Sequence, residues 1–385
     1  MREWVLCNKS SIDSLLSTTR EALDNENIQL EDVAQSIADA HNTISSVIDG
    51  SIRSFKNNKI TNIDMYVFGE CESLESIDLP LVTSIGGYAF QNCTSLESVN
   101  LPSVTSISGA FSRCTSLKSI DLPLVTSIGI RAFYNCTALE SVNMPLVVEI
   151  GDTAFRNCTS LGSIDMPLVT YIGDSAFYIC KSLKSVNLPL VTSIGDYAFY
   201  YCYSLESVNL PSVTTIGSSA FDNCESLKSI DLSNVTNIDS GAFIGCTSLE
   251  SINIPLVTSI GTRAFYSCES LKSVNLPLVT SIGKYAFQNC TSLESIDLSK
   301  VTSIGSSAFS GCSVLNTLIL RSETMCTLST TSAFINTPIK NGTGYIYVPN
   351  ALIEDYKSAT NWSTYANQFR TIEDYPEICN PITTE

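Results

Sequence analysis

The chain has 385 residues and a formal net charge of −17. Nucleic acids and anionic lipid surfaces are bound through Lys and Arg, so this charge argues against both kinds of partner. No segment approaches the run of about 18 apolar residues that a membrane helix requires, and we therefore expect no membrane insertion. The first residues, Met1 to Leu16, contain Glu3 and Asp13 and no long apolar run, so they do not resemble a secretory signal.

Residues 1–50 are expected to form a helical N-terminal cap. Ser10 and Asp13 have the spacing of a capping box, which places the start of a first helix there. A second helix is expected from about Gln29 to Ile48. The alternative is that these helices form a small docking or oligomerisation module.

A repeat dominates residues 51–335. Successive cysteines lie 22 residues apart, except that Cys93 and Cys114 are separated by 21 because one residue is missing near Gly109. A fixed period of this length is typical of a solenoid, in which each unit buries its apolar face against its neighbours. The cysteines of this column are Cys71, Cys93, Cys114, Cys136, Cys158, Cys180, Cys202, Cys224, Cys246, Cys268, Cys290 and Cys312.

Each repeat contains the pattern Leu-x-x-Ile-x-Leu, as at Leu117, Ile120 and Leu122. We expect one short strand per repeat, stacked into a parallel sheet with about 4.8 Å between strands. A proline then ends the strand because it cannot donate to the ladder. An Ala-Phe pair leads back along the opposite side, and we expect the Phe column, Phe90 to Phe309, to be buried.

The repeat resembles the BspA-like, or treponemal-type, class of bacterial leucine-rich-repeat surface proteins. That class has Leu-x-x-Ile-x-Leu-Pro followed by Ile-Gly-x-x-Ala-Phe-x-x-Cys, and the resemblance extends over roughly residues 51–335. It implies an α/β repeat fold, a leucine-rich-repeat solenoid with a parallel, concave β-sheet. It also implies a secreted or cell-surface adhesin that binds host proteins or other cells and has no shared catalytic residues.

The residues after the repeats, 336–385, are expected to form a C-terminal cap. The segment from Gly344 to Tyr365 resembles the C-terminal end of such proteins. Two short helices are indicated by the apolar and aromatic residues Leu352, Tyr356, Trp362, Tyr365 and Phe369.

The alternate residues of each strand are predicted to face the exposed side of the sheet. One of these columns is Ser and the next is Asp or Asn, so the surface offers short hydrogen-bonding groups and no deep pocket. It is either a solvated sheet face or a mildly acidic docking surface for an extended partner. The candidate binding face is Ser98, Asn100, Ser119, Asp121, Ser141, Asn143, Ser163, Asp165, Ser185, Asn187, Ser207, Asn209, Ser229 and Asp231.

Aromatic residues replace small or polar ones in the middle of the array. Tyrosine is enriched in the cores of protein interfaces, which makes this stretch a candidate aromatic patch, although scattered surface tyrosines without a role would look the same. The residues are Tyr171, Tyr178, Tyr197, Tyr200, Tyr201 and Tyr203.

No catalytic, cofactor-binding or metal-binding residues are predicted. Zinc sites need close Cys pairs on short loops, and none occurs, so the Cys column is interpreted as packed free thiols. His41 is the only histidine and falls in the second predicted helix. We therefore expect a non-enzymatic interaction or adhesion scaffold that binds a protein or glycan. The alternatives are a structural or receptor-binding component of a phage-like particle and an intracellular scaffold.

Overall fold

The computed structural model describes residues 51–379, which belong to two compact units. The first unit ends at Leu168 and the second begins at Val169. The helices predicted for residues 1–50, and the chain beyond Cys379, lie outside the described residues.

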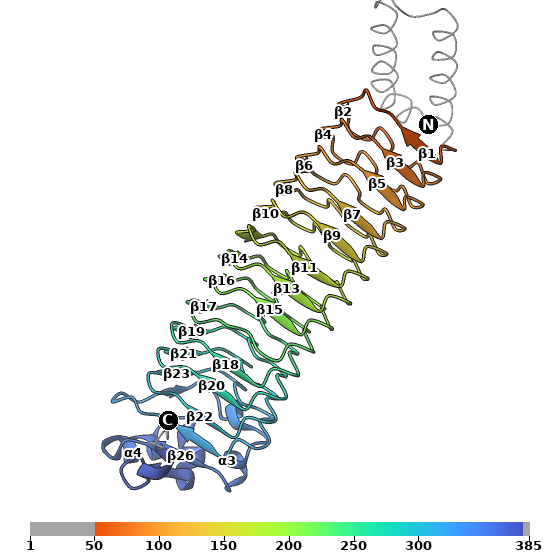
Figure 1. The fold of residues 1–385 in the computed structure, drawn as a ribbon. Coiled ribbons are helices and arrows are strands. Elements are labelled where there is room, and N and C mark those ends of the chain that lie inside the picture. Colours follow the sequence, from red (N-terminus) through yellow and green to blue (C-terminus); the bar gives the residue numbers. More distant parts are fainter. Residues whose placement is uncertain (1–50, 380–385) are drawn as a thin grey trace, which may run out of the picture. The chain divides into compact units, whose positions relative to one another are not determined.

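The first unit is a stack of repeats whose strands pair in parallel (Figure 1). Its three-residue strands are β1 (Ser54–Lys56), β3 (Ser76–Asp78), β5 (Ser98–Asn100), β7 (Ser119–Asp121), β9 (Ser141–Asn143) and β11 (Ser163–Asp165). Its two-residue strands are β2 (Asn62–Ile63), β4 (Ser84–Ile85), β6 (Ser106–Ile107), β8 (Ser127–Ile128) and β10 (Glu149–Ile150). Ser76 lies opposite both Ser54 and Ser98, so equivalent residues of successive repeats are in register.

The second unit has the same organisation. Its two-residue strands form a continuous parallel sheet of β12 (Tyr171–Ile172), β14 (Ser193–Ile194), β16 (Thr215–Ile216), β17 (Asn237–Ile238), β19 (Ser259–Ile260), β21 (Ser281–Ile282), β23 (Ser303–Ile304) and β25 (Thr327–Leu328). Its three-residue strands are β13 (Ser185–Asn187), β15 (Ser207–Asn209), β18 (Ser251–Asn253), β20 (Ser273–Asn275), β22 (Ser295–Asp297) and β24 (Thr317–Ile319). Both units are therefore parallel-strand solenoids, as the repeat predicted.

The two-residue strand was not expected from the sequence, which predicted one strand per repeat. Ile194 is 2% exposed while its neighbour Ser193 is half-buried, so the alternation of a strand is present over only two residues. The backbone ladder extends beyond it, because the N–H of Thr192 donates to the carbonyl oxygen of Thr170 at 3.0 Å. A strand this short cannot be predicted from the sequence, because two residues show no recognisable periodicity.

The segment that returns from each two-residue strand consists of turns and not of a helix. Tyr88 and Asn92 have φ of 59° and 58°, and the equivalent two positions of other repeats are also left-handed. A right-handed helix requires a negative φ at every residue. Two residues with positive φ in each repeat therefore prevent a helix from forming there. The prediction of an α/β repeat is thus right in its parallel strands, whereas the helix content it implied is low.

Hydrogen bonds between repeats also hold the turns. The Phe90 N–H donates to the carbonyl oxygen of Ala110 at 2.8 Å, and the Asn92 N–H donates to that of Ser112 at 2.9 Å. Backbone groups on the turn side of the repeat are thereby satisfied by the next repeat, as buried peptide groups require.

The core of each unit contains stacked columns of Phe and Cys. In the second unit the Phe199 ring lies 5.2 Å from the rings of both Phe177 and Phe221, and the Phe side chains of the column from Phe90 to Phe309 are fully buried, as predicted. The cysteines of the column are buried and are not joined in disulfides. In the first unit the thiol of Cys136 donates to the carbonyl oxygen of Phe111 at 3.0 Å.

The second unit ends in a region of mixed structure. Its elements are η1 (Thr331–Phe334), α3 (Pro338–Asn341), β26 (Tyr345–Val348), η2 (Asn350–Leu352), α4 (Ile353–Ser358), η3 (Trp362–Gln368), β27 (Phe369–Thr371) and α5 (Pro376–Cys379). β26 pairs with β24, and the Trp362 indole donates to the carbonyl oxygen of Cys326 at 2.7 Å. The Phe334 ring stacks on Phe309, the last ring of the Phe column, at 5.6 Å, and the Tyr365 ring meets Phe334 edge-on at 5.5 Å.

Candidate functional site

In the first unit the predicted face is formed by the three-residue strands. Ser119 and Asp121 of β7 are exposed, while Ile120 between them is 4% exposed. The other predicted residues of this unit are likewise exposed, namely Ser98, Asn100, Ser141, Asn143, Ser163 and Asp165. The strands therefore present Ser and Asp or Asn outward at each step.

The Asp and Asn side chains of this face hydrogen-bond to one another across the strands. The Asn143 amide donates to the Asp121 carboxylate at 2.9 Å, and the Asn100 amide donates to Asp78 at 2.7 Å. The bonds from Lys56 and from Asn100 lower the pKa of Asp78 below its ordinary value. Alternation of Asp with Asn thus replaces repulsion between like charges by a hydrogen bond.

The second unit continues the pattern with two local differences. Ser185, Ser207 and Asn209 are exposed, whereas Asn187 is half-buried and accepts a hydrogen bond from the Asn209 amide at 2.7 Å. Ser229 and Asp231 are exposed but lie outside the named strands, since Asp231 forms only an isolated bridge with Asn253.

The sequence after Asp231 also differs from that of most repeats, because Ser233 stands where they have proline. The Asp231 carboxylate accepts a hydrogen bond from the N–H of Ser233 at 3.0 Å, which a proline at that position could not donate.

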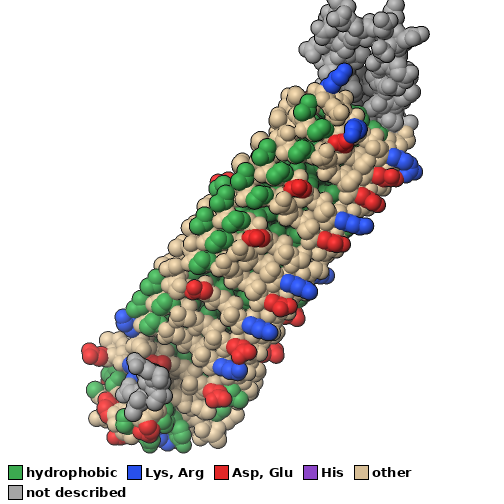
Figure 2. Space-filling view, viewed as in Figure 1, with side chains coloured by type: hydrophobic (Ala, Val, Ile, Leu, Met, Phe, Trp, Pro, Cys, Tyr) green, Lys and Arg blue, Asp and Glu red, His purple; other side chains and the backbone are tan. Residues whose placement is uncertain are grey.

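A charged column borders the Ser column. Figure 2 shows acidic and basic side chains alternating along one border of the surface in view. In the second unit Lys272 and Glu250 form an ion pair at 3.1 Å, and in the first unit Arg53 pairs with Glu75. These exposed pairs contribute little to stability individually, but they make neighbouring repeats compatible.

Five of the six predicted tyrosines form a connected cluster in the second unit. The Tyr200 ring lies 4.8 Å from Tyr178, 5.7 Å from Tyr197 and 4.1 Å from Tyr201, and Tyr201 lies 5.3 Å from Tyr203. The hydrogen bond between Tyr200 and Tyr201 is the main cause of a raised pKa at Tyr200. These five rings are therefore in contact with one another, as their proximity in the sequence suggested.

Tyr171, the sixth predicted tyrosine, is not among these ring contacts, whereas Asp222 is close enough to affect Tyr200 electrostatically. Tyr171 is 41% exposed and belongs to a different column, because it lies on β12 opposite Ser193. Asp222 is 7% exposed, and burial raises the pKa of its carboxyl to about 6. The Tyr201 N–H donates to the Asp222 carbonyl oxygen at 2.9 Å, which ties the backbone of the two repeats together.

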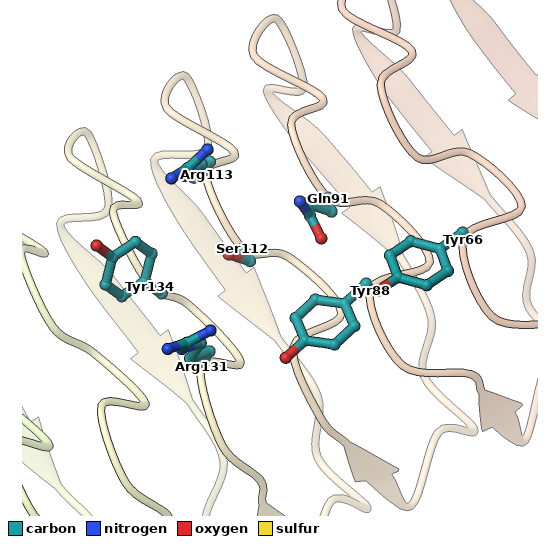
Figure 3. A pocket seen from close by; sticks show the side chains of 7 residues that line it. All are labelled: Tyr66, Tyr88, Gln91, Ser112, Arg113, Arg131 and Tyr134. Atoms are coloured by element: carbon teal, nitrogen blue, oxygen red, sulfur yellow. The ribbon is translucent and has the colours of Figure 1, made fainter. Parts of the chain in front are cut away.

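A hollow in the first unit was not predicted from the sequence. It has a volume of about 360 Å³. Figure 3 shows Tyr66 and Tyr88 on one side and Tyr134 with two arginines on the other, with Ser112 between them. The lining residues are Tyr66, Tyr88, Gln91, Ser112, Arg113, Arg131 and Tyr134. They come from four repeats and match no motif, so the missing residue beside Gly109 was the only signal for it in the sequence.

Residues 51–379 contain no group of three or more His, Cys, Asp or Glu side chains arranged to hold a metal ion. Burial raises the pKa of the Cys136 thiol to about 12 and that of Cys71 to about 12, so these thiols remain protonated at neutral pH. In the described part of the chain, no helix has both the length and the apolar character needed to span a membrane.

Comparison with known proteins identifies the repeat. The family described as BspA type leucine rich repeat region matches residues 50–162, 148–258 and 236–354. A leucine-rich repeat protein from Bacteroides ovatus is 28% identical, with a TM-score of 0.58 over 83% of this chain and 91% of that one. A leucine rich cell surface protein from Faecalibacterium prausnitzii is 27% identical, with a TM-score of 0.43 over 80% of this chain and 86% of that one. No curated protein sequence matches the chain.

Proposed function

Because the chain belongs to the BspA-type leucine-rich-repeat family, we propose that it is a non-enzymatic interaction or adhesion scaffold at the bacterial cell surface. Leucine-rich-repeat proteins are typically scaffolds for protein interaction. The partner proposed here is an extended protein or glycan that lies along the Ser and Asp/Asn columns.

The register of the exposed columns is the observation that carries this proposal. Ser185 lies opposite Ser207, and Asn187 lies opposite Asn209, so the same pair of groups recurs at each strand. Neighbouring strands are about 4.8 Å apart, and a partner with its own regular spacing meets equivalent groups repeatedly. Because the side chains are short, the face favours many shallow contacts over one enclosed site.

The hydrogen bonds within the face support the same role. Amides such as that of Asn143 are held by a neighbouring carboxylate, so their positions are set before a partner arrives. Ordering side chains in advance reduces the entropy lost on binding. The exposed Ser hydroxyls and the remaining carboxylate lone pairs are the groups a partner would use.

We further assign capping roles to the two ends of the array. At the C-terminal end, residues 336–385, the support is the packing of Trp362 and Tyr365 on Phe334, the buried ring that stacks on Phe309 at the end of the Phe column. At the N-terminal end, residues 1–50, the support is the amphipathic pattern of the sequence. A solenoid exposes an apolar row wherever it stops, and terminal elements must cover it.

Two variants of the full chain test whether binding is distributed over the Ser and Asp/Asn columns, which we call a distributed face. Partners are first found by screening the protein against extracellular-matrix proteins and a glycan array. One variant lacks residues 246–289, which removes two whole repeats and leaves both ends intact. The other replaces Tyr200, Tyr201 and Tyr203 with Ser, which removes most of the aromatic cluster and leaves the strand face.

A distributed face predicts that the shortened protein binds with reduced affinity, because several equivalent contacts are lost together. The tyrosine variant should bind about as well as the wild type. The opposite result, full binding by the shortened protein and none by the tyrosine variant, would place the site at the aromatic cluster. Failure of both panels to yield a partner would contradict the adhesion role itself.

A further inference from the structure

We propose that the hollow around Ser112 in the first unit binds a single acidic sugar residue. This site lies on the turn side of the repeats, away from the Ser and Asp/Asn columns, and is independent of the function proposed for that face. Its ligand class follows from three features of the lining: two arginine side chains, aromatic walls and neutral polar groups.

The cations are Arg113 and Arg131. Their guanidinium carbons lie 6.0 and 5.9 Å from the centroid of the Tyr134 ring, so both charges gather around one aromatic side chain (Figure 3). The ion pairs that the structure shows within residues 51–379 include neither arginine. Two guanidinium groups without a carboxylate partner can bind an anion through paired N–H donors.

The backbone of both arginines is fixed. The Arg113 N–H donates to the carbonyl oxygen of Tyr134 at 2.6 Å, and the Arg131 N–H donates to that of Asp152 at 3.1 Å. Both residues also have positive φ, 62° and 57°, which sets the direction in which their side chains leave the turn. The positions of the two charges are therefore held by the fold, which favours binding.

The aromatic side chains that line the hollow favour a sugar as the ligand that carries the anionic group. The Tyr66 and Tyr88 rings stack at 5.4 Å and 10°, opposite Tyr134. A pyranose ring has C–H groups on its faces, which pack on aromatic rings, and hydroxyls at its rim, which need neutral hydrogen-bonding groups. Gln91 and Ser112 supply such groups between the walls. A volume of about 360 Å³ lies at the small end of ligand sites, which suits one residue of a glycan.

The charge of the whole chain limits how acidic the ligand can be. A net charge of −17 repels a polyanionic chain, whereas two local cations attract a ligand with one negative group. The acidic group is a carboxylate, as in a sialic or uronic acid, or a sulfate ester, and both present the oxygens that guanidinium groups recognise.

The irregular repeat creates the space. The 21-residue repeat has Gly109 and Ser112 at two positions where its neighbours have Tyr88 with Gln91 and Arg131 with Tyr134. A Cβ at residue 109 would lie 2.6 Å from the Tyr88 ring, which shows that this ring covers the glycine closely. Because the small residues of this repeat lie between larger side chains of the repeats before and after it, a hollow remains at the surface.

The second unit contains a natural counterpart in which the space is filled. Gly241 and Arg263 occupy the positions of Gly109 and Arg131, but Ile244 replaces Ser112. The Ile244 side chain comes within 2.9 Å of where a Cβ on Gly241 would lie, so it occupies the equivalent space. The repeat thus accepts isoleucine at this position, and Ser112→Ile is a substitution that should fill the hollow within the same fold.

The experiment measures binding of the full-length protein to four probes by ligand-observed NMR and calorimetry. The probes are sialyllactose, a disaccharide ending in glucuronic acid, a sulfated lactose and unmodified lactose. We expect at least one acidic probe to bind and lactose to bind at least about ten-fold more weakly, because it lacks the charged group. Comparison of the carboxylated and sulfated probes identifies which acid the site prefers.

Three variants locate the site. Ser112→Ile and the double variant Arg113→Gln/Arg131→Gln should each reduce binding at least about ten-fold. Arg263→Gln, which removes an arginine 5.2 Å from the Tyr285 ring in the second unit, is the matched control and should leave binding unchanged. Because both arginines of the hollow are exposed, the double variant tests the site without altering the core.

Equal binding of lactose and the acidic probes, no binding of any acidic probe, or full binding by the double variant would overturn the proposal. Deletion of residues 246–289 should not affect this binding, since those residues lie in the other unit. The deletion therefore tests binding by the Ser and Asp/Asn columns, and the Ser112 and arginine variants test binding in the hollow, so either proposal can fail without the other.

Discussion

Backbone conformation sets which residues suit two positions of each repeat. The position before the column cysteine is left-handed throughout the described repeats, and Asn or Gly occupies it in most of them. Both residues tolerate positive φ, Gly because it lacks a Cβ and Asn because its short side chain bonds locally. The other residues at this position are Glu70, Arg113, Ile179, Tyr201 and Ser267. Among them only Ile179, with a φ of 61°, has a β-branched side chain. A β-branched side chain is strained in this conformation.

Replacing Ile179 with Asn should therefore stabilise the protein. We expect the free energy of unfolding to rise by about 1 kcal/mol, since relief of left-handed strain outweighs the loss of a half-buried aliphatic group. Urea denaturation measures the change. Ile179→Val is the control, because valine keeps the β-branch and should bring no gain. A lower stability for the Asn variant would show that the packing of Ile179 matters more than its backbone.

At the scale of the element, the Phe column is the main structural unit of the turn side. Phe199 is fully buried between two rings at 5.2 Å, and Phe199→Ala should lower the free energy of unfolding by roughly 3–5 kcal/mol by leaving a cavity. Leu190→Ala is the matched control in the same repeat. Leu190 is 47% exposed, and its truncation should cost less than about 1 kcal/mol. Similar costs for the two variants, measured by urea denaturation, would contradict the role of the column.

The elements differ in how far the sequence predicts them. Leu117, Ile120 and Leu122 define a strand because their spacing places them on one face, and their burial agrees with this. The turns were harder to predict, because left-handed positions are held by residues as different as Tyr88, Arg131 and Asn92. Register with the neighbouring repeats imposes that conformation, and register is a property of the stack that no single repeat reveals.

The candidate sites differ in the same way. The Ser and Asp/Asn columns were predictable because each residue recurs at a fixed interval, and the tyrosine cluster because its members are close in sequence. The hollow depends on small side chains, Gly109 and Ser112, next to large ones such as Tyr88 and Arg131. Small residues signal a cavity only when the neighbouring repeats are known in space.

At the scale of the whole molecule, the buried thiols predict sensitivity to alkaline pH. Burial raises the pKa of Cys136 to about 12 and that of Cys326 to about 12, whereas a thiol in the unfolded chain ionises near pH 8.5. The folded-state pKa is the higher one, so the stability these thiols contribute is complete below about pH 8.5 and is lost as pH rises toward 12. Each such thiol should cost the folded state about 2 kcal/mol at pH 10.

Urea denaturation at pH 7, 9 and 10 under reducing conditions measures this effect. We expect stability to fall steeply between the last two values, because many thiols titrate together on unfolding. In Cys136→Ala nearly one proton fewer is released on unfolding. The free energy of unfolding should therefore fall less steeply with pH, by about 1.4 kcal/mol per pH unit. A stability that stays constant up to pH 10 would show that the thiols are ionised, or accessible, in the folded protein.

The in-register pairing of equivalent residues has a consequence for how such a gene changes over generations. When every repeat presents the same backbone partners to the next, as Ser185 and Ser207 do, recombination between two repeats joins surfaces that already fit. Crossovers can then lengthen or shorten the array by whole repeats while the encoded protein still folds. The 21-residue repeat behaves differently, since a crossover that removes it also removes Gly109 and Ser112. Natural variants should therefore vary freely in repeat number, and inheritance of the hollow should follow that one repeat.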